Sequence, residues 1–389
     1  MPTVLISAGE VSGDLHGAHL VREMHKRASD LKFFGIGGNE MKNNGVELRY
    51  HIDRMGLVGL AEVVRQLPFV RRVLGQFRRL MEQRRPDLVI LIDYPGFNLQ
   101  LARVAARMSI PVLYYIAPQV WAWGAGRIKT IARYVEKVAV ILPFEVDLYR
   151  QAGVDVEFVG HPLLESLDPV LMKEEFYRRY GLRNSGPLLG LLPGSRPAEI
   201  GRLLPVMLKA ARIIRAEIGD LQVVVAAASA VDVHQIERTI GLHRAETVVI
   251  RGSTHEVMRY ADLLLIASGT ATLEAACYGT PSLILYKVGF ITWLIGQRLV
   301  RVPHIGLVNI IAGKQIVPEC IQFDATPARV ASEALLLLRD QERREGMRSE
   351  MMKVRQQLGE EGASARTAQI ALDLLRGTRA PSSLRRSGP

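Results

Sequence analysis

Short runs of apolar residues alternate along the chain with longer segments in which apolar residues recur every three or four positions. The short runs are rich in Val, Ile and Leu and end at Gly, Pro or Asp, which is typical of buried parallel strands. They lie at residues 3–7, 32–36, 88–93, 112–116 and 138–142, and again at 188–192, 222–227, 247–251, 263–267 and 282–286. Strands that alternate with helices form parallel sheets with right-handed crossovers. The pattern therefore predicts an α/β fold with two doubly wound, Rossmann-like domains.

The predicted domains meet near Gly160, His161 and Pro162, directly after the last strand of the first half. From Ala328 onward the pattern is purely helical, and the end of the chain is basic and contains no acid. We expect an N-terminal domain at residues 1–160, a C-terminal domain at 161–340, helices at 341–376 and a disordered basic tail at 377–389. In doubly wound domains ligands bind beyond the carboxyl ends of the strands, so candidate residues are those that directly follow strands.

Composition narrows the class of protein. With 48% hydrophobic and 23% charged residues in 389, the chain is an ordinary globular protein. Cys277 and Cys320 are the only cysteines, too few for a disulfide framework or a four-thiolate zinc site. His16 and His19 lie three residues apart without an evident third ligand, so no metal site is predicted. No signal peptide is recognisable, and no apolar run reaches the roughly 18–20 residues of a membrane span.

The net charge of +11 fits general solubility, an anionic membrane, nucleic acid or phosphorylated ligands. With only 6% aromatic residues and no recognisable nucleic-acid motif, nucleic acid is the weaker interpretation. The absence of a G-x-x-x-x-G-K-[ST] motif argues against a P-loop ATPase.

The first candidate loop follows the strand at 3–7 and contains Gly9, Ser12, Gly13 and Asp14. Its glycines permit a tight turn and close approach of a ligand to the backbone. Ser12 is also a suitable N-cap for the next helix, with Asp14 in its first turn. The spacing is not that of a dinucleotide fingerprint, and the second strand ends without an acid for a ribose, so NAD binding is disfavoured.

The second candidate is Asp93, at the end of an apolar strand. Partial burial there raises the pKa of a carboxylate and suits a general base. A carboxylate that merely accepts bonds from loop N–H groups fits the residue type as well.

Two further loops follow strands of the second half. Ser195 and Arg196 precede a helix whose N-terminus attracts anions, although a surface ion pair would also explain the arginine. Ser268, Gly269 and Thr270 form a small-residue turn that suits a phosphate. Glu274 follows one helical turn later and is suited to ribose hydroxyls, or simply to the positive end of the helix dipole.

Residues 55–82 predict a basic amphipathic surface for anionic lipid, although an ordinary domain helix has the same pattern. We expect Pro68 to break or kink this segment. A second candidate is the apolar stretch at 289–302, around Trp293, as a core helix or the wall of an acyl-chain groove. The candidate lipid contacts are Arg65, Leu67, Phe69, Arg71, Arg72, Arg78, Arg79 and Trp293.

Together these motifs resemble the lipid-A-disaccharide synthase family. The resemblance runs from about residue 3 to 320 and, as a set, is highly specific. It rests on A-G-E-x-S-G-D at 8–14, I-D-x-P-x-F-N at 92–98, P-x-V-W-A-W at 118–123, L-P-F-E at 142–145, F-x-G-H at 158–161, L-L-P-G-S-R at 191–196 with Glu199, S-G-T-A-T-L-E at 268–274 and N-x-x-A-G at 309–313.

The resemblance implies a GT-B fold, C-terminal helices at 341–376 that pack back on the first domain, and an inverting reaction without metal or cofactor. UDP-2,3-diacylglucosamine would donate its sugar to 2,3-diacylglucosamine 1-phosphate, giving a β(1→6) disaccharide and UDP. The first domain would bind acceptor and lipid, and the second the UDP-sugar. The family's suspected base corresponds to Asp93, and Glu10, Arg196 and Asn309 match other implicated positions. Where the family often has a second acid, this chain has Gly96.

The resemblance also implies a cytoplasmic enzyme at the surface of the inner membrane, with the oligomeric state open and a homodimer among the options. Two alternatives remain: another UDP-sugar enzyme of GT-B fold, such as an epimerase or a lipid-linked wall transferase, and a non-catalytic lipid- or nucleotide-binding protein.

Overall fold

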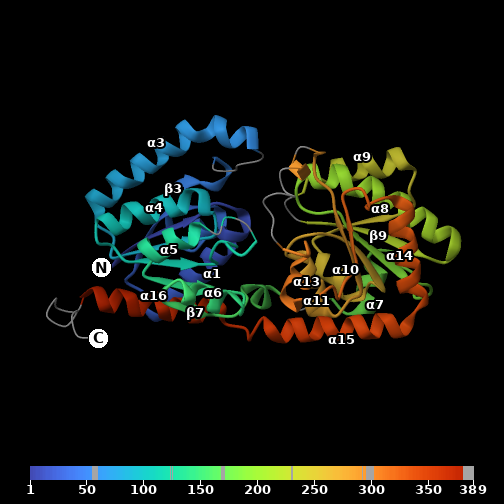
Figure 1. Ribbon diagram of the computed structural model, residues 1–389. Coiled ribbons are helices and arrows are strands. Elements are labelled where there is room, and N and C mark those ends of the chain that lie inside the picture. The colour runs from blue at the N-terminus through green and yellow to red at the C-terminus, as the bar shows by residue number, and fades with distance from the viewer. Residues whose placement is uncertain are drawn as a thin grey trace. The chain divides into compact units, whose positions relative to one another are not determined.

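The chain folds into two compact units, each built on its own parallel sheet (Figure 1). The computed structural model describes residues 1–54, 60–122, 124, 126–167, 171–228, 231–290, 292–294 and 302–379, with the backbone alone at 54, 60–67, 378 and 379. The first unit comprises Met1–Glu165 and Leu358–Pro389, and the second comprises Ser166–Gln357.

The first unit contains a seven-stranded sheet in the order β3-β2-β1-β4-β5-β6-β7. Its strands are β1 (Thr3–Ala8), β2 (Lys32–Gly37), β3 (Val46–His51), β4 (Leu88–Ile92), β5 (Val112–Tyr115), β6 (Lys137–Val140) and β7 (Val156–Phe158). Its helices are α1 (Val11–Arg27), α2 (Asn39–Asn43), η1 (Ile52–Arg54), α3 (Leu60–Arg84), α4 (Pro95–Arg107), α5 (Arg127–Tyr134), α6 (Glu145–Gln151) and α16 (Ala363–Arg379), while η2 (Pro162–Ser166) ends at the boundary.

Alternating side chains of the first sheet fill two cores, one on each face. Leu5, Val89 and Leu91 pack with Phe77 of α3 and Phe97 of α4 on one face. Val4, Ile6, Ile90 and Ile92 pack on the other face with residues of α1 and α16, which lie side by side. Because strands buried on both faces carry apolar side chains throughout, β1 and β4 have no polar face.

The last helix is fastened to the first unit by buried polar contacts as well as by its apolar face. The Ser364 hydroxyl donates to Glu165 at 2.6 Å, and the Arg366 guanidinium donates to the carbonyl of Val159 at 2.8 Å. The predicted return of the C-terminal helix to the first unit is therefore observed.

The second unit contains a six-stranded sheet in the order β10-β9-β8-β11-β12-β13. Its strands are β8 (Leu188–Leu192), β9 (Gln222–Ala227), β10 (Val248–Arg251), β11 (Leu263–Ala267), β12 (Ser282–Tyr286) and β13 (Glu319–Ile321). Its described helices are α7 (Lys173–Arg179), α8 (Pro197–Glu217), α9 (Val233–His243), α10 (Thr254–Tyr260), α11 (Ala271–Tyr278), α13 (Leu307–Ala312), α14 (Pro327–Arg339) and α15 (Gln341–Gln357).

The structure confirms the α/β class, and every strand predicted from an apolar run is present within a residue or two. The pattern missed β3, β7 and β13, which lie at sheet edges and carry charged residues such as Glu47, Glu157 and Glu319. Edge strands are only partly covered, so they do not need the continuous apolar run that reveals a central strand.

Two helical segments differ from the expectation. Helix α3 continues through Pro68, so the chain does not break there, and Val73, Phe77 and Met81 of the following turns lie in the core. Helix α15 contacts α11, α13 and α14 of the second unit, whereas the resemblance implies that all of residues 341–376 pack on the first. Residues 380–389 of the predicted tail lie outside the described residues.

Candidate active site

The switch point of the first sheet lies between β1 and β4, because the chain leaves these neighbouring strands toward opposite sides of the sheet. Gly9 and Glu10 follow β1, and Asp93 and Tyr94 follow β4. Both Asp93 and Tyr94 have left-handed backbones, with φ of 44° and 49°. Non-glycine residues adopt such values only where their surroundings hold them there.

Buried side chains hold the backbone of Asp93 in this conformation. The amide of Asn98 donates to the carbonyl of Asp93 at 2.7 Å and to that of Ile92 at 3.1 Å. The hydroxyl of Tyr114 also donates to the Asp93 carbonyl, at 2.7 Å. The Ser7 hydroxyl in turn donates to the Asn98 side-chain oxygen at 2.8 Å, so the amide cannot rotate freely. The sequence motif included Asn98 but gave no sign of this role.

The carboxyl group of Asp93 has a pKa raised to about 6, mainly because it is partly buried and further because Glu10 faces it. A backbone hydrogen bond from Tyr94 opposes the shift without cancelling it. Glu10 itself is exposed. A carboxylate with this pKa is mostly ionised at neutral pH and still holds a proton more strongly than an ordinary aspartate, as a general base must.

The two glycines beside this carboxylate have opposite surroundings. A Cβ on Gly9 would lie 2.2 Å from the Tyr94 ring, so the ring packs directly on the Gly9 backbone. A Cβ on Gly96 would meet nothing within 4 Å. The position where the family often has a second acid is therefore open, and its glycine is not required by packing.

Ser12, Gly13 and Asp14 do not form the expected ligand loop, because α1 already begins at Val11. Glu10 occupies the N-cap position and no side chain caps the helix, so the prediction of Ser12 as N-cap is wrong. Asp14 is buried and accepts backbone N–H bonds from Gly38, Glu40 and Met41. It thereby holds the start of α2.

A second buried acid lies near the same carboxyl edge and was not predicted. Glu145 begins α6 and accepts a hydrogen bond of 3.0 Å from the indole of Trp121. Burial raises the pKa of Glu145 to about 7, and one of its carboxyl oxygens has no hydrogen-bond partner. The motif at 142–145 contained this residue, yet only the folded chain reveals its environment.

The switch point of the second sheet lies between β8 and β11 and brings two predicted loops together. Arg196 is the N-cap residue of α8, with its side chain 66% exposed, and its guanidinium lies 3.3 Å from the carboxylate of Glu199. Ser195 is exposed. Gly194 has a φ of 105° and packs so closely on Glu199 that a Cβ would lie 2.6 Å from its carboxylate.

The turn from β11 into α11 contains Ser268, Gly269 and Thr270, of which Thr270 is exposed. The Ser268 hydroxyl donates to the carbonyl of Ile305 at 3.0 Å. Glu274 lies in the first turn of α11, 3.9 Å from the ring of His255. Burial raises the pKa of Glu274, and His255 opposes that shift.

Asn309 is fully buried, and its amide is engaged within the protein. Its nitrogen donates to the carbonyl of Val317 and to the carboxylate of Glu319, and its oxygen accepts from the N–H groups of Ile316 and Val317. In this arrangement the side chain supports the surrounding backbone and has no group left for a ligand.

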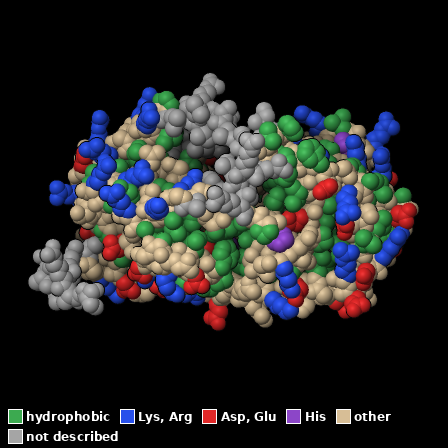
Figure 2. All heavy atoms as spheres, in the orientation of Figure 1, with side chains coloured by type: hydrophobic (Ala, Val, Ile, Leu, Met, Phe, Trp, Pro, Cys, Tyr) green, Lys and Arg blue, Asp and Glu red, His purple; other side chains and the backbone are tan. Residues whose placement is uncertain are grey.

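The predicted lipid contacts are partly described. Arg71, Arg72, Arg78 and Arg79 are exposed on α3, and Lys and Arg side chains gather on this part of the surface in Figure 2. Arg78 pairs with Glu82 at 3.1 Å. Phe69 is half-buried and its ring meets that of Tyr50, which leaves little of it for insertion. The side chains of Arg65 and Leu67 lie outside the described residues.

In the second unit, Trp293 is half-buried between two exposed apolar residues, Phe290 and Leu294. Across the described residues, no group of three or more potential ligands is arranged for a metal ion. Among the helices of the described residues in both units, none is both long and apolar enough to cross a membrane.

Comparison with known proteins places this arrangement in context. The family model of lipid-A-disaccharide synthetase matches residues 4–374. The lipid-A-disaccharide synthase of Syntrophus aciditrophicus is 49% identical over 96% of this chain and 98% of its own. That of Geobacter metallireducens is 44% identical over 96% of this chain and 97% of its own.

Solved structures show the fold at much lower identity. UDP-GlcNAc 2-epimerase from Neisseria meningitidis, bound to UDP-GlcNAc, superposes with a TM-score of 0.66 at 13% identity and covers 95% of this chain and 100% of its own. The glycotransferase of kitacinnamycin superposes with a TM-score of 0.60 at 15% identity, over 96% of this chain and 98% of its own. These likenesses confirm the GT-B fold.

Proposed function

The chain belongs to the lipid-A-disaccharide synthase family, whose members are glycosyltransferases, and from this premise we propose a specific reaction and mechanism. The enzyme transfers the sugar of UDP-2,3-diacylglucosamine to the 6-hydroxyl of 2,3-diacylglucosamine 1-phosphate. The products are the β(1→6) disaccharide 1-phosphate and UDP. The observation that carries this proposal is the half-buried carboxylate of Asp93 at the switch point of the first sheet, on a backbone fixed by Asn98 and Tyr114.

Asp93 is the general base. Its carboxylate removes the proton from the acceptor hydroxyl while the hydroxyl oxygen forms a bond to the anomeric carbon of the donor. The bond from that carbon to the UDP oxygen breaks, and UDP leaves with the electron pair. Attack from the face opposite the leaving group inverts the anomeric configuration. Glu10 contributes through the field that keeps the proton affinity of Asp93 high.

The second unit binds the donor. Its first anchor is Arg196, whose exposed guanidinium exchanges its half-buried partner Glu199 for the diphosphate. Such an exchange is favourable because an exposed ion pair contributes only about 0–1 kcal/mol, whereas a phosphate at a helix N-terminus also gains from the backbone N–H groups. Ser195 and the turn at Ser268, Gly269 and Thr270 supply further donors, and Glu274 accepts from the ribose hydroxyls.

The enzyme reaches its acylated substrates at the cytoplasmic surface of the inner membrane. Arg71, Arg72 and Arg79 are exposed on α3, and none of them has an ion-pair partner among the described residues. Each cation near an anionic leaflet contributes on the order of 1 kcal/mol. Phe290 and Leu294 beside Trp293 offer exposed apolar surface for acyl chains in the second unit.

The test is a coupled assay with both acylated sugars in mixed micelles, in which mass spectrometry detects the disaccharide 1-phosphate and UDP release is followed in parallel. We expect equal amounts of the two products, and no UDP release when the acceptor is omitted. Epimerised donor without disaccharide would indicate a UDP-sugar epimerase. Binding of UDP without any turnover of either lipid would indicate a non-catalytic protein.

A further inference from the structure

The segment that precedes α13 in the second unit is held by the carboxylate of Glu319. Glu319, the first residue of β13, accepts a hydrogen bond from the N–H of Ile305 at 3.1 Å and another from the N–H of Gly306 at 2.9 Å. It also accepts from the amide of Asn309 at 2.7 Å. No ion pair to Glu319 occurs within the described part of the chain, so its charge is balanced by N–H dipoles.

The peptide group of Ile305 connects this carboxylate to the turn after β11. Its N–H is bound by Glu319, and its carbonyl accepts the hydrogen bond from the Ser268 hydroxyl at 3.0 Å. A change in the position of the Glu319 carboxylate therefore moves the acceptor that orients Ser268. Ser268 opens the small-residue turn that leads into α11 and Glu274.

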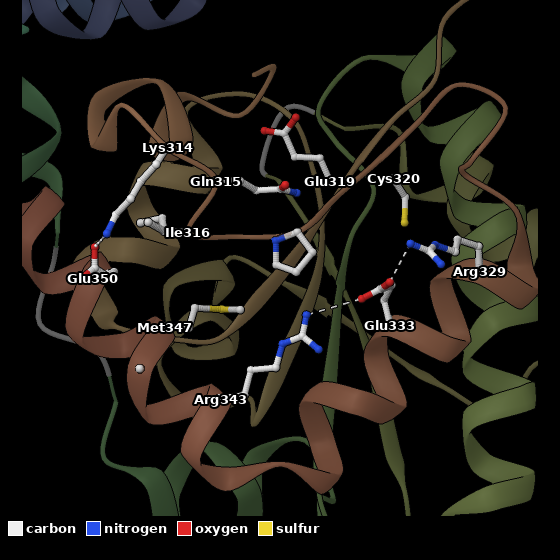
Figure 3. A pocket seen from close by; sticks show the side chains of 12 residues that line it. Lys314, Gln315, Ile316, Glu319, Cys320, Arg329, Glu333, Arg343, Met347 and Glu350 are labelled. Carbon is white, nitrogen blue, oxygen red and sulfur yellow. Dashed lines mark ion pairs between the residues drawn. The ribbon is translucent and has the colours of Figure 1, made fainter. Parts of the chain in front are cut away.

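The surroundings leave this segment little freedom. A Cβ on Gly306 would lie 2.4 Å from Ile284 and 3.1 Å from the Glu319 carboxylate, so the backbone packs directly on β12 and β13. Glu319 lines a cavity of about 500 Å³ (Figure 3), and the ion pairs among the residues that line this cavity, Lys314 with Glu350 and Glu333 with Arg329 and Arg343, do not include it. Glu319 thus serves the backbone at 305–306 and not the charged wall of the cavity.

We propose that Glu319 is a positioning residue for nucleotide binding, acting through Ile305 on Ser268, and that Asn309 supports the same segment rather than touching the donor. The proposal rests on the proposed function, which places UDP at the turn after β11. It predicts that Glu319 controls affinity for UDP although its carboxylate is bound to backbone N–H groups and to Asn309.

The test replaces Glu319 with glutamine, which keeps the size of the side chain and removes the charge. One carboxylate oxygen becomes an NH₂ group that faces an N–H donor, so at least one bond to residues 305–306 is lost. Hydrogen bonds to charged groups contribute on the order of 1.5–3 kcal/mol, which corresponds to roughly tenfold to a hundredfold in affinity. We expect calorimetry to show UDP binding weakened by about tenfold or more, with KM for the lipid acceptor unchanged. Glu319→Asp, which keeps the charge on a shorter side chain, should give a smaller loss and provides a second variant if the first does not fold.

A double-mutant cycle separates positioning from plain stabilisation. If Glu319 acts through Ile305 and Ser268, then Glu319→Gln weakens UDP binding much less in a Ser268→Ala background, because the connection is already broken. Fully additive losses in UDP affinity would overturn the proposal. The matched control is Gln222→Leu: Gln222 is buried at the amino end of β9 and bonds to the backbone of Arg183 and Ser185. This variant should lower the melting temperature and leave UDP affinity unchanged.

Comparing Glu319→Gln with Glu274→Ala distinguishes a failure of the positioning role from a failure of the proposed donor site. If Glu274→Ala weakens UDP binding while Glu319→Gln binds UDP as the wild type does, the donor site stands and the positioning role is wrong. If neither variant changes the affinity, UDP does not bind at this turn and both proposals are wrong.

Discussion

The two switch points are built on the same topology but hold their acids in opposite electrostatic settings. In the first unit, partly buried Asp93 faces another acid, Glu10, which raises its pKa further. In the second unit, Glu274 faces His255, which lowers the pKa that burial raises. A neighbouring acid disfavours the charged form of a carboxylate and adds to the effect of burial, whereas a neighbouring positive charge favours the charged form and opposes it. Burial is the larger cause of the raised pKa at both acids, and the two switch points differ in whether the neighbour adds to that shift or opposes it.

The backbones at the two edges differ as well. Asp93 and Tyr94 are left-handed, and Asn98 and Tyr114 hold the carbonyl of Asp93. Thr270, at the start of α11, has an ordinary right-handed conformation. This difference fits the proposed roles, because a catalytic base has to be fixed to within a fraction of an ångström, whereas exposed groups that contact a diphosphate tolerate adjustment.

The largest effect is expected from Asp93→Asn. The amide cannot accept the proton, and general-base catalysis contributes about 10²–10⁴-fold to the rate. We expect kcat to fall by that factor in the disaccharide assay, while UDP affinity stays unchanged because the proposed donor site lies in the other unit.

The matched control is Asp87→Asn, at the amino end of the same strand. Asp87 accepts a hydrogen bond from the N–H of Thr3 at 2.7 Å, so replacing its carboxylate with an uncharged amide weakens this charge-assisted bond and should lower the melting temperature while sparing turnover. Turnover of the folded Asp93→Asn enzyme within a few-fold of the wild type would mean that Asp93 is not the base.

The contrast between the switch points explains which parts of the site the sequence predicted. Asp93 and Arg196 were found because central parallel strands are continuous apolar runs, and the residues that end them are recognisable. Two partners in these sites were not predicted, because they come from other elements: Tyr114 of β5 bonds to the carbonyl of Asp93, and His255 of α10 lies beside Glu274. Asp14 was assigned to a ligand loop, since no local pattern reveals that it holds the start of α2 from 24 residues away.

The next largest effect is expected from variants at the switch point of the second sheet. Arg196→Ala and Glu274→Ala remove a charge-assisted bond to the diphosphate and the acceptor for the ribose hydroxyls, respectively. Each bond contributes on the order of 1.5–3 kcal/mol, so UDP affinity should fall roughly tenfold to a hundredfold by calorimetry. Arg339→Ala removes a comparable exposed arginine that pairs with Glu217, and should leave the affinity as it is. If both Arg196→Ala and Glu274→Ala bind UDP with wild-type affinity, UDP does not bind at the switch point of the second sheet.

A smaller effect distinguishes the outer surfaces of the two units. The double variant Arg72→Gln and Arg79→Gln removes exposed charges from α3, at about 1 kcal/mol each near an anionic leaflet. Flotation with vesicles that contain anionic lipid should then recover less protein than for the wild type, and raised salt should narrow the difference. Lys209→Gln with Arg212→Gln removes the same charge from exposed positions of α8 in the second unit and is the control. Equal losses in both pairs would mean that net charge alone, and not α3, governs attachment.

The smallest effect concerns Glu10 and appears in the pH profile. Asp93 works as a base only when ionised, so kcat/KM of the wild type should fall as the pH drops below about 6. Glu10→Gln removes the like charge, and the pKa of Asp93 should move back toward its ordinary value of 3.8, shifting the acid limb to lower pH.

The same pKa shift predicts an effect on stability. A raised pKa means that the folded state favours the protonated form of Asp93. Asp93 therefore stabilises the fold most at low pH and loses that contribution as the pH rises through about 6. Glu10→Gln should consequently melt at a higher temperature than the wild type at pH 8 and at nearly the same temperature at pH 4.

The control for the pH profile is Glu136→Gln, which removes an exposed acid at the amino end of β6 and should leave the acid limb in place. An acid limb that stays at the same pH in Glu10→Gln would show that burial alone sets the proton affinity of Asp93, and the electrostatic contrast between the two switch points would then rest on His255 only.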